Sequence, residues 1–161
     1  MPPALIAVDE LAEWSPWMPF SEARAAAPRQ PGVYLAREGL DGPIVYAGMA
    51  GERRGQGIRG RLNVYGSGKA LASGLGEAVM DRALADVHWL RERLDDVEQG
   101  RPLRAKAWGQ AAFARANLHV CWAITGDRRS AFELERAVLI ALNHGDLWNR
   151  APRQLNLTGP P

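Results

Sequence analysis

The stretch PGVYLAREGLDGPIVYAGMA, residues 31–50, contains two short apolar runs, GVYLA and IVYAG, with one tyrosine in each. Runs rich in β-branched and aromatic residues favour strands. The segment between them holds two glycines and a proline, which is typical of a turn or short loop. The stretch therefore predicts a β-hairpin in which Tyr34 and Tyr46 occupy equivalent places on neighbouring strands, so that their hydroxyls can converge.

Beyond the hairpin, the sequence predicts helices and one further strand. In order along the chain, these are a short helix at 58–66, a helical region at 70–99, a strand at 118–126 and a helix at 130–145. The short helix is indicated by Ile58, Leu62 and Tyr65, which recur at spacings of four and three. Ser130 followed by Glu133 has the spacing of a capping box, so we expect the last helix to begin at this serine.

Strands and helices do not alternate regularly in this order, which indicates an α+β fold rather than a doubly wound parallel sheet. We expect a small three-stranded, mainly antiparallel sheet flanked by helices. Residues 1–30 contain the aromatic segment WSPWMPF and are expected to pack on the body as an irregular arm. An apolar stripe is expected along the 70–99 region, formed by Val79, Leu84, Val87, Leu90, Leu94 and Val97.

Length and composition set limits on the protein class. A chain of 161 residues with 47% hydrophobic residues is expected to form one domain with a real core. No apolar run is long enough to span a bilayer, and the first residues lack a basic signal region, so no membrane association is expected. The single cysteine, Cys121, fits a reducing cytoplasm and a core position.

Basic residues are concentrated between positions 53 and 69, where no carboxylate occurs: Arg53, Arg54, Arg59, Arg61 and Lys69. Phosphate groups are the natural partner of such a patch. A solvated surface loop is the alternative. Within the short helix, Arg61 falls beside Tyr65 in angle whereas Arg59 points elsewhere, so Arg61 is expected to face a site.

Glu135 is out of place on the last predicted helix, because its angle falls within the apolar face, between Leu139 and Leu142. A carboxylate among apolar neighbours needs a cation, a metal or a set of donors. A buried ion pair with one of the arginines is the structural alternative to a functional role.

Other familiar motifs are excluded. GSGKA, residues 66–70, lacks the first glycine of a phosphate-binding loop and has Ala70 where a magnesium-binding hydroxyl is required. His88, His119 and His144 have no metal-ligand spacing. No serine or cysteine lies in a nucleophile turn.

Taken together, these residues resemble the GIY-YIG nuclease family. The resemblance covers about 31–65 and 118–149, with a helical insertion at 66–117, an arm at 1–30 and a tail at 150–161. It departs from the family pattern at Ala47, in the long glycine-rich loop before Arg61, and in the insertion. Because of the long loop, Arg59 is the alternative to Arg61 as the family's arginine. Its elements occur in the family's order: Gly32-Val33-Tyr34, Val45-Tyr46-Ala47-Gly48, Arg61, Tyr65, Glu135, Leu139-Ile140 and Trp148-Asn149.

The resemblance implies a metal-dependent endonuclease that hydrolyses phosphodiester bonds of DNA by means of an activated water. Glu135 would bind a divalent cation, Mg²⁺ or alternatively Mn²⁺, and Arg61 would stabilise the phosphate. Tyr34 is favoured as the group that activates the water, although Tyr34 and Tyr46 could exchange roles. Tyr65 would hold phosphate or water, and Asn149 would fix the site by hydrogen bonds. Nucleic-acid contacts are expected from the basic patch, at Arg53, Arg54, Arg59 and Lys69.

Two other functions remain open on the sequence alone. The chain could be a module of the same fold that binds nucleic acid without cutting it. It could also be a structural component whose arm and insertion dock a partner. The sequence leaves the oligomeric state open between monomer and homodimer, and it does not distinguish DNA from RNA.

Overall fold

The computed structural model describes residues 7–142 and 147–150. The predicted hairpin is present: β2 (Gly32–Glu38) pairs antiparallel with β3 (Ile44–Ala50). On its other edge β2 pairs antiparallel with β4 (Leu118–Ile124), which places the third predicted strand. A short fourth strand, β1 (Met18–Pro19), makes the sheet four-stranded with the order β1-β4-β2-β3. The α+β class is thus confirmed, whereas the expected count of three strands was too low.

The N-terminal segment is more regular than predicted. It forms β1 and the helix α2 (Phe20–Ala26) rather than an irregular arm. Met18 pairs with Val120 of β4, and just before it Ser15 exchanges hydrogen bonds of 2.8 and 3.0 Å with the backbone of Trp122. This segment supplies partners to the outer edge of β4, whose backbone groups would otherwise lack them.

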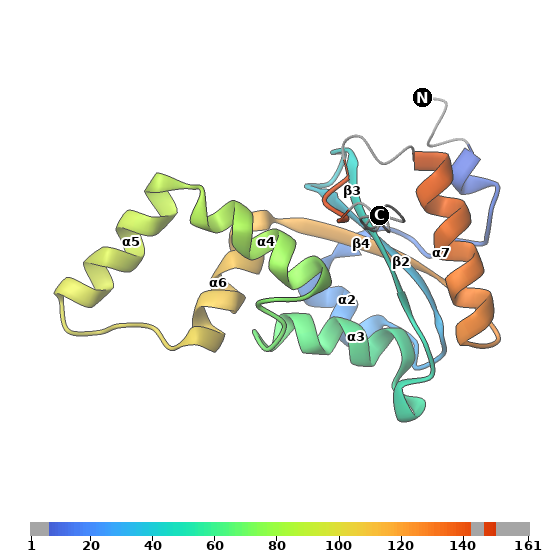
Figure 1. Ribbon diagram of the computed structural model, residues 1–161, viewed down its shortest axis with the longest axis horizontal. Helices are drawn as coiled ribbons and strands as arrows, with labels where there is room; N and C mark the ends of the chain where they lie inside the picture. Colours follow the sequence, from blue (N-terminus) through green and yellow to red (C-terminus); the bar gives the residue numbers. More distant parts are fainter. Residues whose placement is uncertain (1–6, 143–146, 151–161) are drawn as a thin grey trace, which may run out of the picture.

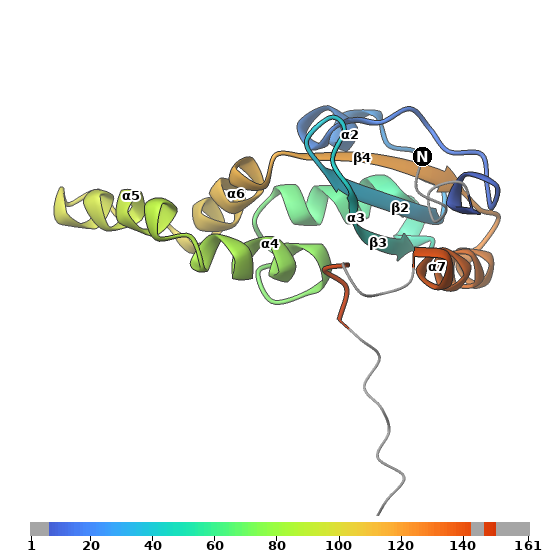
Figure 2. The same ribbon diagram turned by 90° about the horizontal axis from the view of Figure 1, so that it is seen from above.

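Helices cover both faces of the sheet (Figures 1 and 2). After β3 the chain forms the short 3-10 turn η1 (Arg53–Gly55) and α3 (Gly57–Gly66), and α7 (Arg128–Leu142) follows β4. Alternate residues of a strand face opposite sides. Accordingly, Tyr34 packs with Ile58 and Leu62 of α3, whereas Val33 packs with Val138 of α7.

The insertion contains three helices: α4 (Gly74–Leu84), α5 (Val87–Glu98) and α6 (Ala105–Ala116). The expected helical region at 70–99 therefore divides into two, because Asp86 caps α5 by accepting a 3.2 Å hydrogen bond from the Trp89 N–H. α4 packs with α6 and approaches β3, while α5 stands away from the sheet (Figure 1).

The expected capping box of α7 was wrong. The helix begins at Arg128, and its cap is the Asp127 carboxylate, which accepts a 2.7 Å hydrogen bond from the Ser130 N–H. Ser130 lies inside the helix, where Glu133 pairs with Arg129 instead. Two cap residues occur three positions apart here, and the earlier one is used, so the helix gains most of a turn. The predicted end of this helix at Gly145 lies outside the described residues.

No helix in residues 7–142 or 147–150 combines the length and apolar character needed to cross a membrane.

Candidate active site

Two tyrosines lie on the same face of the hairpin. Tyr34 of β2 is opposite Gly48 of β3, and Tyr46 is opposite Ala36. The two tyrosines are therefore diagonal neighbours, with ring centroids 6.2 Å apart and an interplanar angle of 23°. The equivalent strand positions predicted from the sequence do bring the two phenols together.

Gly48 makes room for this arrangement. A Cβ at this residue would overlap the hydroxyl of Tyr34 and lie 2.9 Å from the Tyr46 ring. Any larger residue would therefore push one of the phenols off the sheet. The packing of the two phenols therefore explains why a glycine stands at position 48, the end of the Val45-Tyr46-Ala47-Gly48 motif.

A third tyrosine comes from α3. The Tyr65 hydroxyl lies 3.0 Å from the Tyr34 hydroxyl and accepts a 3.3 Å hydrogen bond from the Leu75 N–H. Arg61, one turn earlier, places its guanidinium carbon 4.8 Å from the centroid of the Tyr65 ring. The helical spacing of four therefore puts Arg61 beside the phenols, as the sequence predicted.

Three polar groups from two elements, α3 and β3, converge at Gly74, the first residue of α4. The position that a Cβ of Gly74 would take is no more than 3.1 Å from the Tyr65 hydroxyl, the Tyr46 hydroxyl and the Arg61 Nη2. Gly74 also has a positive φ of 52°, which favours glycine. No local sequence pattern predicts a role for Gly74, because only the folded chain brings α4 against β3.

Glu135 is half-buried on α7, which packs on the face of the sheet opposite the phenols. Burial raises the pKa of its carboxyl group, and the charge of Arg61 acts in the opposite direction. The Glu135 charge in turn contributes to raising the pKa of Tyr46. The link between Glu135 and the groups Arg61 and Tyr46 is thus one of charge, and Glu135 does not line the cavity beside Tyr46. Among the described residues Glu135 forms no ion pair, so a sealed structural pair is not what the structure shows.

Burial keeps the phenols protonated. Burial, and after it the neighbouring Tyr65, raises the pKa of Tyr34 well above its ordinary value, and the same causes raise the pKa of Tyr46. Tyr34 is 1% exposed and Tyr46 is 8% exposed. Of these two, Tyr46 lines the cavity described below, so it is better placed than Tyr34 to meet a substrate or water.

Asn149 holds the edge of the site in place. Its side chain accepts a 3.1 Å hydrogen bond from the Ala47 N–H and donates a 2.6 Å bond to the Ala47 carbonyl. The Trp148 N–H also donates to the Val45 carbonyl, at 2.6 Å. This segment covers the outer edge of β3 on both sides of Tyr46 and fixes the backbone from which that phenol projects.

The predicted nucleic-acid contacts have different surroundings. Arg53, Arg54 and Lys69 are exposed, the first two in η1. The Arg59 guanidinium instead donates hydrogen bonds of 2.7 and 2.9 Å to the carbonyls of Ala27 and Ala25 at the end of α2. These bonds occupy Arg59 in joining α3 to α2, whereas Arg61 lies among the phenols.

A cavity of about 270 Å³ opens beside Tyr46 and Gly74. Its wall contains Glu77, Asp81 and Arg82 of α4 together with Trp148. The Arg82 guanidinium lies 4.1 Å from the centroid of the Trp148 ring. Of the three polar groups that converge at Gly74, Tyr46 borders this space, which a substrate group can enter.

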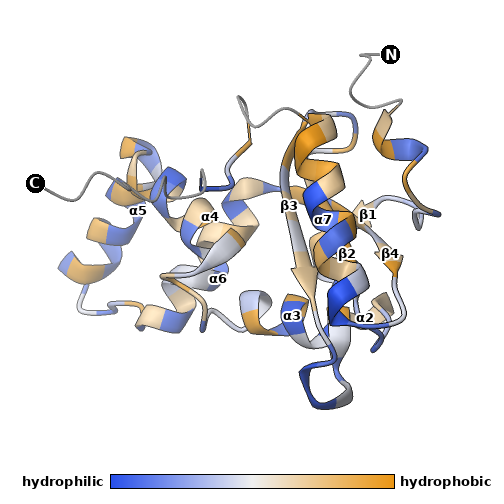
Figure 3. Cartoon of the chain, turned by 45° about the vertical axis from the view of Figure 1, so that its right-hand side comes forward, coloured by the Kyte–Doolittle hydropathy of each residue, from blue (hydrophilic) through white to orange (hydrophobic). Residues whose placement is uncertain are grey.

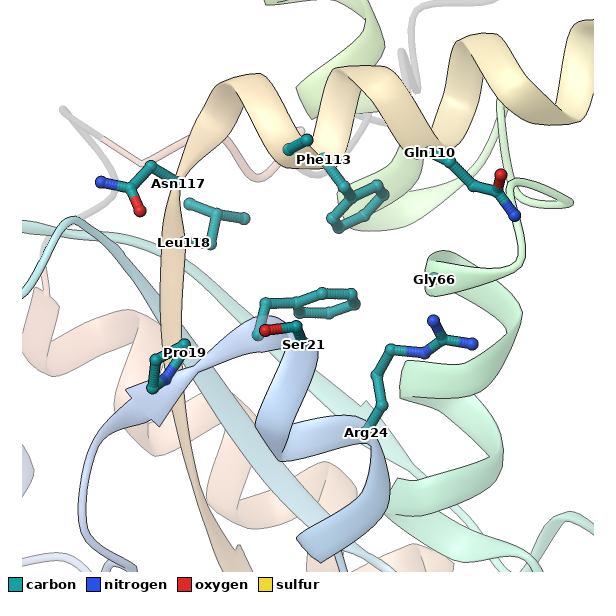
Figure 4. Close-up of a pocket in the computed structure, with 10 residues that line it drawn as sticks. Pro19, Ser21, Arg24, Gly66, Gln110, Phe113, Asn117 and Leu118 are labelled. Carbon is teal, nitrogen blue, oxygen red and sulfur yellow. The ribbon is translucent and has the colours of Figure 1, made fainter.

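A separate cavity of about 380 Å³ lies between α2, α6 and the start of β4. Figure 4 shows Arg24 and Gln110 along one side and Asn117 and Leu118 along the other. It includes none of the predicted site residues. We therefore assign the candidate active site to the smaller cavity, which is lined by two of the predicted residues, Tyr46 and Asn149.

The donor set limits the metal that could bind. Within the described part of the chain, no cluster of three or more His, Cys, Asp or Glu side chains could hold an ion. Zinc and similar ions require such clusters. Mg²⁺ differs because it keeps several waters and is commonly held by one or two carboxylates with substrate phosphates. Glu135 alone is compatible with that mode of binding.

Comparison with known proteins finds no matching family model and no match among curated proteins or solved structures.

Proposed function

We propose that this chain is a divalent-metal-dependent nuclease that hydrolyses phosphodiester bonds of nucleic acid, in the first instance DNA. The observation that supports the proposal is the convergence of the Arg61 guanidinium and the Tyr46 and Tyr65 hydroxyls around Gly74. Glu135 completes the set, because it is unpaired among the described residues and lies within the field of Arg61. Phosphoryl transfer needs charge stabilisation, an oriented water and help for the leaving oxygen.

Arg61 would bind the scissile phosphate. Its planar guanidinium can donate two parallel hydrogen bonds to phosphate oxygens, and it remains charged at any relevant pH. The Tyr65 ring supports the guanidinium from one side at 4.8 Å, which limits its conformations before substrate binds. A guanidinium held in this way stabilises the negative charge that grows on the phosphoryl oxygens during reaction.

Tyr46 would orient the attacking water, in place of Tyr34, which the sequence alone favoured. Because its pKa is raised by burial, Tyr46 is protonated at neutral pH and acts by hydrogen bonding. The buried Tyr34 and Tyr65 hydroxyls fix the orientation of the surrounding groups through their mutual hydrogen bond. Asn149 keeps β3, and therefore Tyr46, in position.

Glu135 would hold the divalent cation, which when bound supplies electrophilic activation of the phosphate and a lower pKa for water. A half-buried carboxylate with no cation partner among the described residues fits such a ligand. The exposed Arg53, Arg54 and Lys69 would contact phosphates away from the point of cleavage, which positions the substrate without reading its sequence.

A second candidate function is binding of nucleic acid without cleavage. It is favoured by the raised pKa of both Tyr34 and Tyr46, because neither phenol can serve as a strong base at neutral pH. The basic residues would then act alone.

A plasmid-nicking assay with Mg²⁺ and Mn²⁺, run beside a fluorescence-anisotropy binding assay, tests the proposal. Wild type is expected to nick the plasmid. Glu135→Gln should abolish nicking and keep DNA binding. Glu133→Gln, an exposed acid on the same helix, serves as the matched control and should behave as wild type.

If wild type binds DNA or RNA and cleaves neither with any divalent cation, the second function replaces the first. If binding is also absent, or is insensitive to salt, both proposals fail, because phosphate contacts weaken strongly as salt rises.

A further inference from the structure

α5 presents a line of apolar side chains to solvent. Val87, Leu94 and Val97 are 59%, 54% and 51% exposed, and Leu90 lies between them on the same side. The helix stands at the end of the molecule, away from the sheet (Figures 1 and 2), and Figure 3 shows hydrophobic residues along it. Exposed apolar residues that form a continuous stripe indicate an interaction surface, whereas single ones do not.

The spacing of the stripe is that of a coiled coil. Val87, Leu90, Leu94 and Val97 follow one another at intervals of three, four and three residues, as do the a and d positions of a heptad repeat. The side of α5 that packs on the body is different. It carries Trp89, which is buried and meets Trp108 of α6 edge to face at 5.3 Å. That side lies about 120° around the helix from the centre of the stripe. Packing on α6 therefore leaves Val87, Leu94 and Val97 exposed, while Leu90 is partly buried beside Trp89.

Charged residues flank the stripe at the e and g positions. Two of them already have partners: Asp86 pairs with Arg115 at 2.7 Å, and Arg93 pairs with Asp96 while lying over the Trp89 ring. The e positions, Arg91 and Glu98, are exposed and form no ion pair with other described residues. Their opposite charges are available to another molecule.

The available charges are complementary to a second α5. In an antiparallel pair of such helices, e positions face e positions, so Arg91 meets Glu98 of the second copy and the pair repeats by two-fold symmetry. In a parallel pair, e positions face g positions, and the residues at g are Asp86 and Arg93, which are already engaged. The antiparallel arrangement uses the charges that the fold leaves available.

We propose that α5 is a self-association surface, which pairs antiparallel with α5 of a second copy of this chain. Val87 would pack against Val97 of the second copy, and Leu90 against Leu94. A seam of only two heptads is short, so the expected species is a weak, concentration-dependent dimer. The proposal does not depend on nuclease activity, because it concerns a helix that contributes nothing to the candidate active site.

Sedimentation equilibrium from about 10 µM to about 1 mM tests the proposal. The wild-type mass is expected to rise towards that of a dimer. Leu94→Glu, which buries a charge in the seam, should keep the protein monomeric throughout. Ile140→Glu is the matched control, because Ile140 is a 69% exposed apolar residue on α7, and it should self-associate as wild type does. Circular dichroism verifies that each variant is folded.

Charge reversal tests the orientation. Arg91→Glu and Glu98→Arg should each weaken the dimer about three- to tenfold, since exposed pairs contribute little individually and reversal adds repulsion. The double variant should restore wild-type affinity, because the antiparallel pairs are rebuilt with exchanged signs. A wild type that stays monomeric, a Leu94→Glu variant that still dimerises, or a double variant as weak as the single ones would each overturn the proposal. If wild type stays monomeric and the α5 stripe becomes inaccessible to solvent when DNA is added, the surface is a nucleic-acid contact and not a dimer interface.

Discussion

The hydroxyl oxygens of Tyr34 and Tyr65 lie 3.0 Å apart and join the central strand β2 to α3 beneath the candidate active site. Both side chains are fully or almost fully buried, at 1% and 0% exposure. This bond fixes the distance between the sheet that carries Tyr46 and the helix that carries Arg61. We therefore expect Tyr34 to support the site through this bond and to take no part in the reaction itself.

Removing the Tyr34 and Tyr46 hydroxyls one at a time should distinguish a role in stability from a role in cleavage. Tyr34→Phe leaves the Tyr65 hydroxyl without one buried partner and should lower the unfolding free energy by about 1 kcal/mol. Tyr46→Phe should change stability little and reduce plasmid nicking about 100-fold, since a water-positioning group is lost. Urea denaturation and the nicking rate measure the two effects. If Tyr34→Phe loses as much nicking activity as expected for Tyr46→Phe and keeps its stability, Tyr34 is the residue that orients the water.

Arg61 and Arg59 form a natural pair for comparison, because they lie two residues apart on α3 and face different surroundings. Arg61→Lys keeps the charge and removes the planar fork, so cleavage should fall about 100- to 1000-fold with unchanged stability. Arg59→Ala loses two bonds to the end of α2 and should cost about 1–2 kcal/mol while the folded protein still cleaves. The opposite pattern would show that Arg59 is the phosphate ligand.

The same two arginines illustrate what the sequence can predict. Helical angles placed Arg61 beside Tyr65, because four-residue spacing is a local property of the chain. The Arg59 guanidinium instead binds the carbonyls of Ala25 and Ala27. These residues lie more than thirty positions away in the chain, so no local pattern predicts the contact. β2, β3, β4 and α3 were predicted from local periodicity and turn residues.

Long-range contacts account for what was missed. β1 exists because the open edge of β4 needs partners, and a segment with two prolines gives little strand signal of its own. The division of α4 from α5 follows the Asp86 cap, which interrupts an apolar pattern that appears continuous in sequence. The true start of α7 depended on which of two nearby cap residues is used, and spacing alone does not decide that.

Gly74 offers a test of the convergence itself. Gly74→Ala introduces a Cβ no more than 3.1 Å from three polar groups of the site and strains a backbone with φ of 52°. We expect cleavage to be lost and stability to fall by about 1 kcal/mol. Gly126→Ala is the control, because a Cβ there meets nothing within 4 Å. If Gly74→Ala cleaves as fast as wild type, the three groups do not act together on a substrate.

Glu135 links function to stability through its protonation. Because burial raises its pKa in the folded protein above the ordinary value of 4.5, the unfolded chain releases this proton at lower pH than the folded one. The folded state therefore loses stability as pH rises from about 4.5 through the raised pKa, and the loss persists at neutral pH. Glu135→Gln, which cannot ionise, should unfold at a higher temperature than wild type at pH 7, and the difference should vanish below pH 4.5.

Thermal unfolding followed by circular dichroism from acidic to neutral pH, in a buffer without divalent cations, measures this difference. Glu133→Gln removes an exposed acid of the same helix that pairs with Arg129, so it should not raise the melting temperature at pH 7. If Glu135→Gln is as stable as wild type or less so at pH 7, the carboxylate is already satisfied within the fold and is not held ready for a cation. In that case the metal-dependent mechanism loses its ligand. Added Mg²⁺ provides an independent readout, because a cation that binds the folded state alone stabilises wild type and leaves Glu135→Gln unchanged.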